Sequence, residues 1–106
     1  MPRALTVARV SVSPETERGY LATVRELAGL LERRGQHLWV FRSSREPHTF
    51  LEFSEAPSAD AHRTRVSRPP EELELEARLR ALATYAPESR ELWEEIPFAA
   101  TRRSGL

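Results

Sequence analysis

Apolar and polar residues alternate with two different periods along the chain. Residues 4–12 are rich in β-branched side chains and predict a first strand. Ser13 and Pro14 suit the N-cap and first position of a helix that runs to about Arg34 and ends at Gly35. Its apolar residues recur at helical spacing on one face, at Tyr20, Val24, Leu27 and Leu31.

The middle of the chain predicts a β-hairpin. Residues 36–42 and 48–54 are strand-like, and the polar residues 43–47 between them form the expected turn. A break at 56–58 follows the second strand.

The second half of the chain is expected to be mostly helical. A short helix is predicted from Ser58 or Asp60 to about Val66. Residues 71–86 predict a longer helix that ends at Pro87, and its inner face carries Leu75, Leu79, Leu82 and Ala86. Residues 90–98 fit either a short final strand or another helical turn, and residues 101–106 are expected to be a flexible tail.

The predicted order of elements is β-α-β-β-α-β, within a single domain that spans residues 1–100. With right-handed crossovers, this order gives an antiparallel sheet that carries both helices on one face. The expected fold class is therefore α+β, with a ferredoxin-like arrangement.

One strand of this sheet lacks a polar face. Leu38 and Val40 point one way, whereas His37, Trp39 and Phe41 point the other way. The next strand repeats the pattern, with Phe50 opposed to Leu51 and Phe53. Because helices cover one face, the other would expose a large apolar patch. We therefore expect a homodimer that forms through the sheet face.

The overall composition bears on which partners and which cellular compartment we expect. The formal net charge is zero, so no nucleic-acid partner is expected. No apolar run approaches the length of a membrane span, and we expect a cytoplasmic protein without a membrane partner. All 16 basic residues are arginine, which is typical of a GC-rich bacterial genome. The lack of cysteine and lysine excludes thiolate and Schiff-base chemistry.

These segments together resemble the dimeric α+β barrel superfamily, especially its antibiotic-biosynthesis-monooxygenase-like branch. The resemblance rests on the strand Leu5–Val12 leading into Ser-Pro-Glu and an amphipathic helix, and on the hairpin His-Leu-Trp-Val-Phe-Arg with Thr-Phe-Leu-Glu-Phe-Ser. It implies two sheets packed as a barrel, with a pocket between sheet and helices in each subunit. Members of the superfamily include cofactor-independent oxygenases, heme-degrading oxygenases and isomerases.

The chain lacks one residue type that these enzymes use. The heme-degrading branch uses an asparagine, a tryptophan and a heme-ligating histidine, and this sequence contains no asparagine. The quinone-forming oxygenases also use asparagine and tryptophan, and Trp39 or Trp93 could supply the aromatic contact. We expect no cofactor.

Three residues are candidates for catalysis. His37 and His48 are each potential general bases, but they lie near opposite ends of the hairpin and predict no metal site. Glu52 lies in an apolar stretch, where desolvation would raise its pKa. The alternative for Glu52 is an ion pair with Arg9 or Arg42 on a neighbouring strand.

Four aromatic residues are candidates for ligand binding: Trp39, Phe41, Tyr85 and Trp93. Packing in the core or in a dimer interface is the alternative use of the same side chains. The expected function is the binding of a small hydrophobic or aromatic molecule, with monooxygenase-like activity. The alternative is a non-catalytic dimeric binding or regulatory module.

Overall fold

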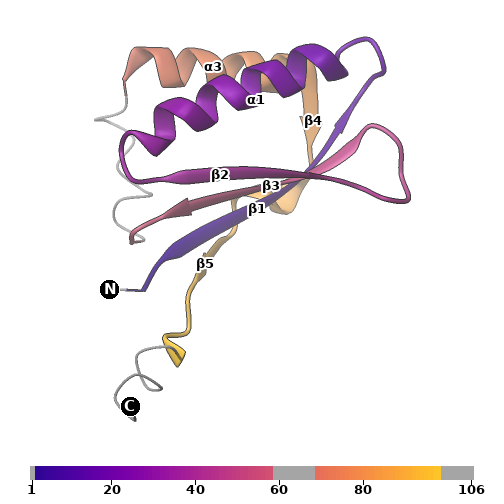
Figure 1. Ribbon diagram of the computed structural model, residues 1–106. Helices are drawn as coiled ribbons and strands as arrows, with labels where there is room; N and C mark the ends of the chain where they lie inside the picture. Colours follow the sequence, from indigo (N-terminus) through magenta and orange to yellow (C-terminus); the bar gives the residue numbers. More distant parts are fainter. Residues whose placement is uncertain (1, 59–68, 99–106) are drawn as a thin grey trace.

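The computed structural model describes residues 2–58 and 69–98, and it confirms the α+β class (Figure 1). Two α-helices lie on one side of an antiparallel sheet, which is the ferredoxin-like arrangement. The elements are β1 (Ala4–Val12), α1 (Glu17–Glu32), β2 (His37–Arg42), β3 (Thr49–Ala56), α3 (Pro70–Leu82), β4 (Ala83–Tyr85), the 3-10 helix η1 (Pro87–Arg90) and β5 (Leu92–Glu94).

The strands lie in the order β2-β3-β1-β4, and β1 therefore pairs with β3 along one edge. Two short strands share the other edge of β1: β4 pairs with its end at Val12, and β5 pairs with its start at Ala4. The predicted hairpin is confirmed, with Trp39 opposite Phe53 and Val40 opposite Glu52. The register places alternate residues of β2 and β3 on the face beneath the helices.

The start of α1 differs from the prediction. Residues 13–16 form a turn before the helix, in which the backbone N–H groups of Thr16 and Glu17 both donate to the Ser13 carbonyl oxygen at 3.1 Å. Ser13 therefore caps this turn, and the helix begins at Glu17. The helix ends at Glu32, before the predicted end at about Arg34. The predicted stop at Gly35 lies in the turn that follows, where Gly35 has a φ of +75° and Gln36 N–H donates to the Leu31 carbonyl oxygen at 3.1 Å.

The second long helix is shorter than predicted. It ends at Leu82, and Ala83–Tyr85 form β4 against Val10–Val12. The edge of β1 offers unpaired backbone groups there, and pairing with them outweighs the weak helix preference of Thr84 and Tyr85. The final strand is also shorter than predicted, at Leu92–Glu94. The predicted helix near residues 58–66 and the predicted tail at 101–106 lie outside the described residues, apart from Ser58.

The core lies between the sheet and the two helices. Its buried apolar side chains come from β1, α1, β3 and α3: Ala8, Val10, Tyr20, Val24, Leu27, Leu31, Phe50, Leu75 and Leu79. Leu38 and Val40 of β2 pack against this cluster, as the alternation predicts. Within the described ranges, no helix combines the length and the apolar character that crossing a membrane requires.

An ion pair between a partly exposed arginine and a buried carboxylate joins the two helices. Glu72, in the first turn of α3, is 1% exposed and accepts two hydrogen bonds of 2.9 Å from Arg34, just beyond the end of α1. The sequence predicts neither residue for this role, although Arg34 lies at the predicted end of the first helix. The fork geometry of the guanidinium fixes the two helix ends relative to each other.

Removing this guanidinium tests its contribution to stability. The substitution Arg34→Ala takes two charge-assisted donors from a buried carboxylate, so we expect the free energy of unfolding to fall by about 2–3 kcal/mol. The neighbouring exposed Arg33→Ala is the control and should change it by less than about 0.5 kcal/mol. Urea unfolding measures both; equal effects would contradict the assignment.

Candidate functional site

Glu52 and two tyrosines form a hydrogen-bonded cluster on the face of the sheet that the helices cover. The hydroxyl group of Tyr20 donates to Glu52 Oε2 at 2.6 Å, and the hydroxyl group of Tyr85 donates to the same oxygen at 2.7 Å. Glu52 is 9% exposed and Tyr20 is fully buried. Three elements, β3, α1 and β4, therefore converge on one carboxylate oxygen.

The local structure explains why these three side chains meet. The alternation along β3 turns Phe50 and Glu52 to the same side, beneath the helices. Tyr20 belongs to the buried stripe of α1, and its ring lies 5.3 Å from that of Phe50. Tyr85 arrives from the opposite side of β1, since β4 pairs it with Val10.

The surroundings of the cluster alter its proton affinities. Burial raises the pKa of the Glu52 carboxyl above its ordinary value, and the hydrogen bonds from Tyr20 and Tyr85 offset part of this rise. Burial, followed by the nearby Glu52 carboxylate, raises the pKa of both tyrosine hydroxyls. The tyrosines therefore stay protonated donors at neutral pH, while the carboxyl exchanges its proton closer to neutrality than an exposed glutamate does.

The predicted ion pairs of Glu52 with arginine are wrong. Ala8, not Arg9, lies opposite Glu52, and the next position turns Arg9 to the other face, where it pairs with Glu46. Arg42 lies 3.3 Å from Glu17 and makes its ion pair there. Among the described residues, the partners of Glu52 are two neutral hydroxyl groups, and none is a cation.

The two histidines lie apart from this cluster and from each other. The His37 ring stacks on Trp39 with 5.4 Å between ring centroids. His48 Nδ1 lies 2.7 Å from Glu17 Oε1, and His48 adopts a positive φ of 56° at the end of the hairpin turn. The described part of the chain contains no group of three or more His, Asp or Glu side chains that could hold a metal ion.

The four aromatic candidates divide between the two faces of the sheet. Tyr85 lies beneath the helices with Glu52. Trp39 and Phe41 lie on the opposite face, where Phe41 meets Phe53 edge to face at 5.4 Å between centroids. Trp93 pairs with Leu5 and is about half exposed. The structure therefore does not bring these four residues together into one site.

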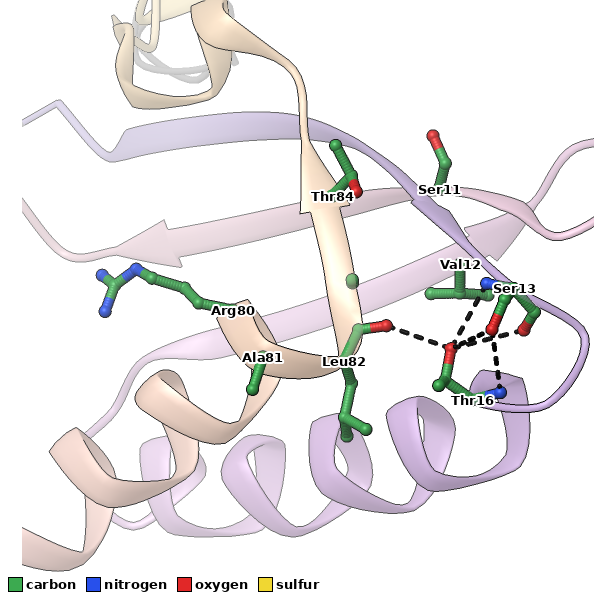
Figure 2. A pocket seen from close by; sticks show the side chains of 9 residues that line it. Ser11, Val12, Ser13, Thr16, Arg80, Ala81, Leu82 and Thr84 are labelled. Carbon is green, nitrogen blue, oxygen red and sulfur yellow. Dashed lines mark hydrogen bonds between the residues drawn. The ribbon is translucent and has the colours of Figure 1, made fainter.

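A pocket of about 410 Å³ opens where α3 passes into β4 (Figure 2). Ser11, Ser13 and Thr84 are among the residues that line it, and Thr16 Oγ1 donates to the Leu82 carbonyl oxygen at 3.1 Å. This bond ties the start of α1 to the end of α3. Glu52 does not line this pocket, so the pocket and the Glu52 cluster are separate features.

Tyr20 is the member of the cluster that the sequence-based prediction missed. Its position in an apolar helical stripe marked it as a core residue. A buried tyrosine hydroxyl nevertheless needs a hydrogen-bond partner. That requirement is the signal that could have linked Tyr20 to Glu52, which shares the inward face of its strand with Phe50.

Comparisons with known proteins identify the fold. No protein-family model matches the sequence, and no curated protein matches it. Solved structures do match. A conserved protein of unknown function from Bacteroides thetaiotaomicron, suggested to be an oxidoreductase, is 14% identical with a TM-score of 0.74, and the match covers 89% of this chain and 98% of that one.

Two further solved structures also match this chain. SnoaB from Streptomyces nogalater, a cofactor-independent oxygenase solved in a mutant form, is 19% identical with a TM-score of 0.70, covering 89% of this chain and 91% of SnoaB. A candidate antibiotic biosynthesis monooxygenase from Chloroflexus aurantiacus is 18% identical with a TM-score of 0.66, covering 92% and 93%. The chain therefore shares the fold of these solved antibiotic biosynthesis monooxygenase structures.

The raised pKa of Glu52 predicts a pH-dependent stability. Its stabilising contribution is complete below the ordinary value of 4.5 and is lost as the pH rises through the raised pKa in the folded protein. Glu52→Gln does not titrate, so the difference in unfolding free energy, parent minus variant, should fall as the pH rises above 4.5.

Urea unfolding at a series of pH values measures this difference. Glu26→Gln, on the exposed side of α1, is the matched control and should give a curve parallel to that of the parent protein. A parent-minus-Glu52→Gln difference that stays constant with pH would contradict the account of the cluster.

Proposed function

We propose that the protein works as a homodimer that binds a small hydrophobic or aromatic molecule and acts as a monooxygenase-like enzyme. The observation that carries the ligand site is the Glu52–Tyr20–Tyr85 cluster, a proton-exchanging group set in an apolar layer. Active sites are where such shifted carboxyl groups gather. The likeness of the fold to SnoaB, described as a cofactor-independent oxygenase, supports the reaction class.

The outer face of the sheet supports the dimer. We use this name for the side opposite the helices, where Trp39 is 44% exposed and Phe41 is 57% exposed. The registers place further apolar side chains on it: Leu5, Val7, Leu51, Phe53 and Trp93. A contiguous apolar surface of this kind usually marks an interface.

The charges at the rim of this face are already paired within the subunit. Arg3 makes a two-pronged ion pair with Glu55, with contacts of 2.6 and 2.8 Å, and Arg9 pairs with Glu46. Protein–protein interfaces typically have an apolar centre surrounded by a polar rim, and this face has both. If a second copy packed the same face against this one, identical apolar side chains would meet across a two-fold axis, and a second copy of this chain is therefore the occupant that we propose.

The energetic gain from such an interface is large. Each large apolar side chain that leaves water contributes about 1.5–3 kcal/mol, so burial of Trp39, Phe41 and their neighbours offsets the cost of association. The resemblance to dimeric α+β barrels implies the same packing of two sheets.

The alternative function is a non-catalytic dimeric binding or regulatory module. It is favoured by the position of Trp39, Phe41 and Trp93 on the outer face, since these aromatic residues would then serve the interface alone. The close packing of Tyr20, Phe50 and Leu79 in the core points the same way. The two functions can be distinguished by whether the purified protein retains a bound small molecule.

The oligomeric state gives a direct test of the dimer. Light scattering at micromolar concentration should give twice the 12.1 kDa mass of the chain. Trp39→Glu should yield monomers, because it places a charge in the centre of the interface. Leu73→Glu is the matched control, since Leu73 on α3 is 45% exposed, and it should remain dimeric. A monomeric parent protein would refute the dimer.

Mass spectrometry under native conditions tests the ligand. We expect a small organic molecule to stay bound after purification and to be released on unfolding. Tyr85→Phe should lower its occupancy, because Tyr85 lies with Glu52, whereas Trp93→Phe on the outer face should leave it unchanged. If Trp93→Phe lowered the occupancy and Tyr85→Phe did not, the ligand would lie on the outer face. A parent protein that retains no ligand would favour the non-catalytic alternative.

A further inference from the structure

A histidine stacks on an aromatic ring of the outer face. His37 and Trp39 are two residues apart on β2, so both side chains point to that face. Their rings lie nearly parallel, with an interplanar angle of 14° and 5.4 Å between the ring centroids. A titratable group therefore lies directly beside one of the most exposed apolar side chains of this surface.

The charged side chains near His37 are already engaged with one another. Glu55 lies opposite His37 on β3 and accepts hydrogen bonds of 2.6 and 2.8 Å from Arg3. The exposed carboxylate of Glu95 accepts a hydrogen bond from the backbone N–H of Arg3 at 3.3 Å. Because the Arg3–Glu55 ion pair carries no net charge, it offers a protonated His37 ring little net attraction.

A second copy packed on the outer face would change the surroundings of the His37 ring. In the single subunit this ring is half-buried, so water still reaches it, and the face of Trp39 favours a nearby positive charge. An interface would replace that water by apolar side chains, and burial disfavours the charged form of histidine. The separated subunits would therefore bind a proton on His37 more readily than the dimer does.

We propose that His37 makes the dimer sensitive to pH: the subunits associate while its ring is neutral and separate when the ring is protonated. This inference rests on the proposed homodimer and concerns the regulation of that interface. Histidine ordinarily changes its charge at a pH of about 6.5, so mild acid is the condition that weakens the dimer. Both subunits contribute a His37 ring, so dissociation takes up a proton at each.

The other titratable groups of the sheet would not produce the same response. The Arg3 guanidinium holds the pKa of the Glu55 carboxyl below its ordinary value, and His37 acts weakly in the same direction, so Glu55 stays ionised in mild acid. Glu52 has a raised pKa, but it lies on the opposite face, beneath the helices. A pH response that requires His37 would therefore report on the interface.

Sedimentation velocity over a range of protein concentrations measures the dissociation constant of the dimer at about pH 7.5 and at about pH 5.5, on either side of the ordinary histidine value. For the parent protein, we expect Kd to be at least about tenfold higher at the lower pH, because two rings each gain a proton on dissociation. His37→Gln stays polar and takes up no proton, so its Kd should change by less than about twofold.

Two further variants complete the test. His48→Gln is the matched control, because His48 lies beside Glu17 at the start of α1, and it should keep the full pH response. His37→Phe retains a ring that can stack on Trp39, so it should stay dimeric at both pH values even if His37→Gln folds poorly. Circular dichroism at both pH values checks that each variant is folded.

The outcomes separate this inference from the dimer on which it rests. A parent protein with the same Kd at both pH values would overturn the role of His37 and leave the dimer in place. A dimer that tightens in mild acid, or a response that persists in both His37 variants, would also overturn that role. A parent protein that is monomeric at both pH values would refute the proposed dimer, and this inference with it.

Discussion

Successive residues of a β-strand point to opposite faces of the sheet, and this alternation along β3 organises the whole molecule. It sends Phe50 and Glu52 beneath the helices and sends Leu51 and Phe53 to the outer face. A shift of one residue would exchange the two sets and bury Arg9 in place of Ala8. The register of the central strands therefore determines both the candidate site and the candidate interface.

Much of the fold could be predicted from the sequence because its signals are local and mutually consistent. The bounds of β1 follow from its β-branched residues, and Gly35 ends α1 because its positive φ suits glycine. Successive residues of a strand point to opposite faces, which directly separates Leu38 and Val40 from Trp39 and Phe41. These features need no information about distant parts of the chain.

The remaining features depend on contacts that are distant in the sequence. Ala83–Tyr85 continue a helical pattern, and the open edge of β1 converts them into a strand. The predicted pair of Arg9 with Glu52 failed for a related reason: the register was not known, and a shift of one position separates their faces. Glu52 was identified as a candidate, but its partners Tyr20 and Tyr85 lie 32 and 33 residues away.

The two faces of the sheet are physically coupled through the strands that they share. Glu52 and Phe53 are adjacent residues of β3, so the backbone that positions the carboxylate also carries a central side chain of the outer face. A second copy packed on that face would restrict the motion of β3 and would keep water from its outer side. Burial of the outer face would thereby stabilise the register that places Glu52 on the other face, so a copy packed there would affect the site although the outer face contributes no residue to the Glu52–Tyr20–Tyr85 cluster.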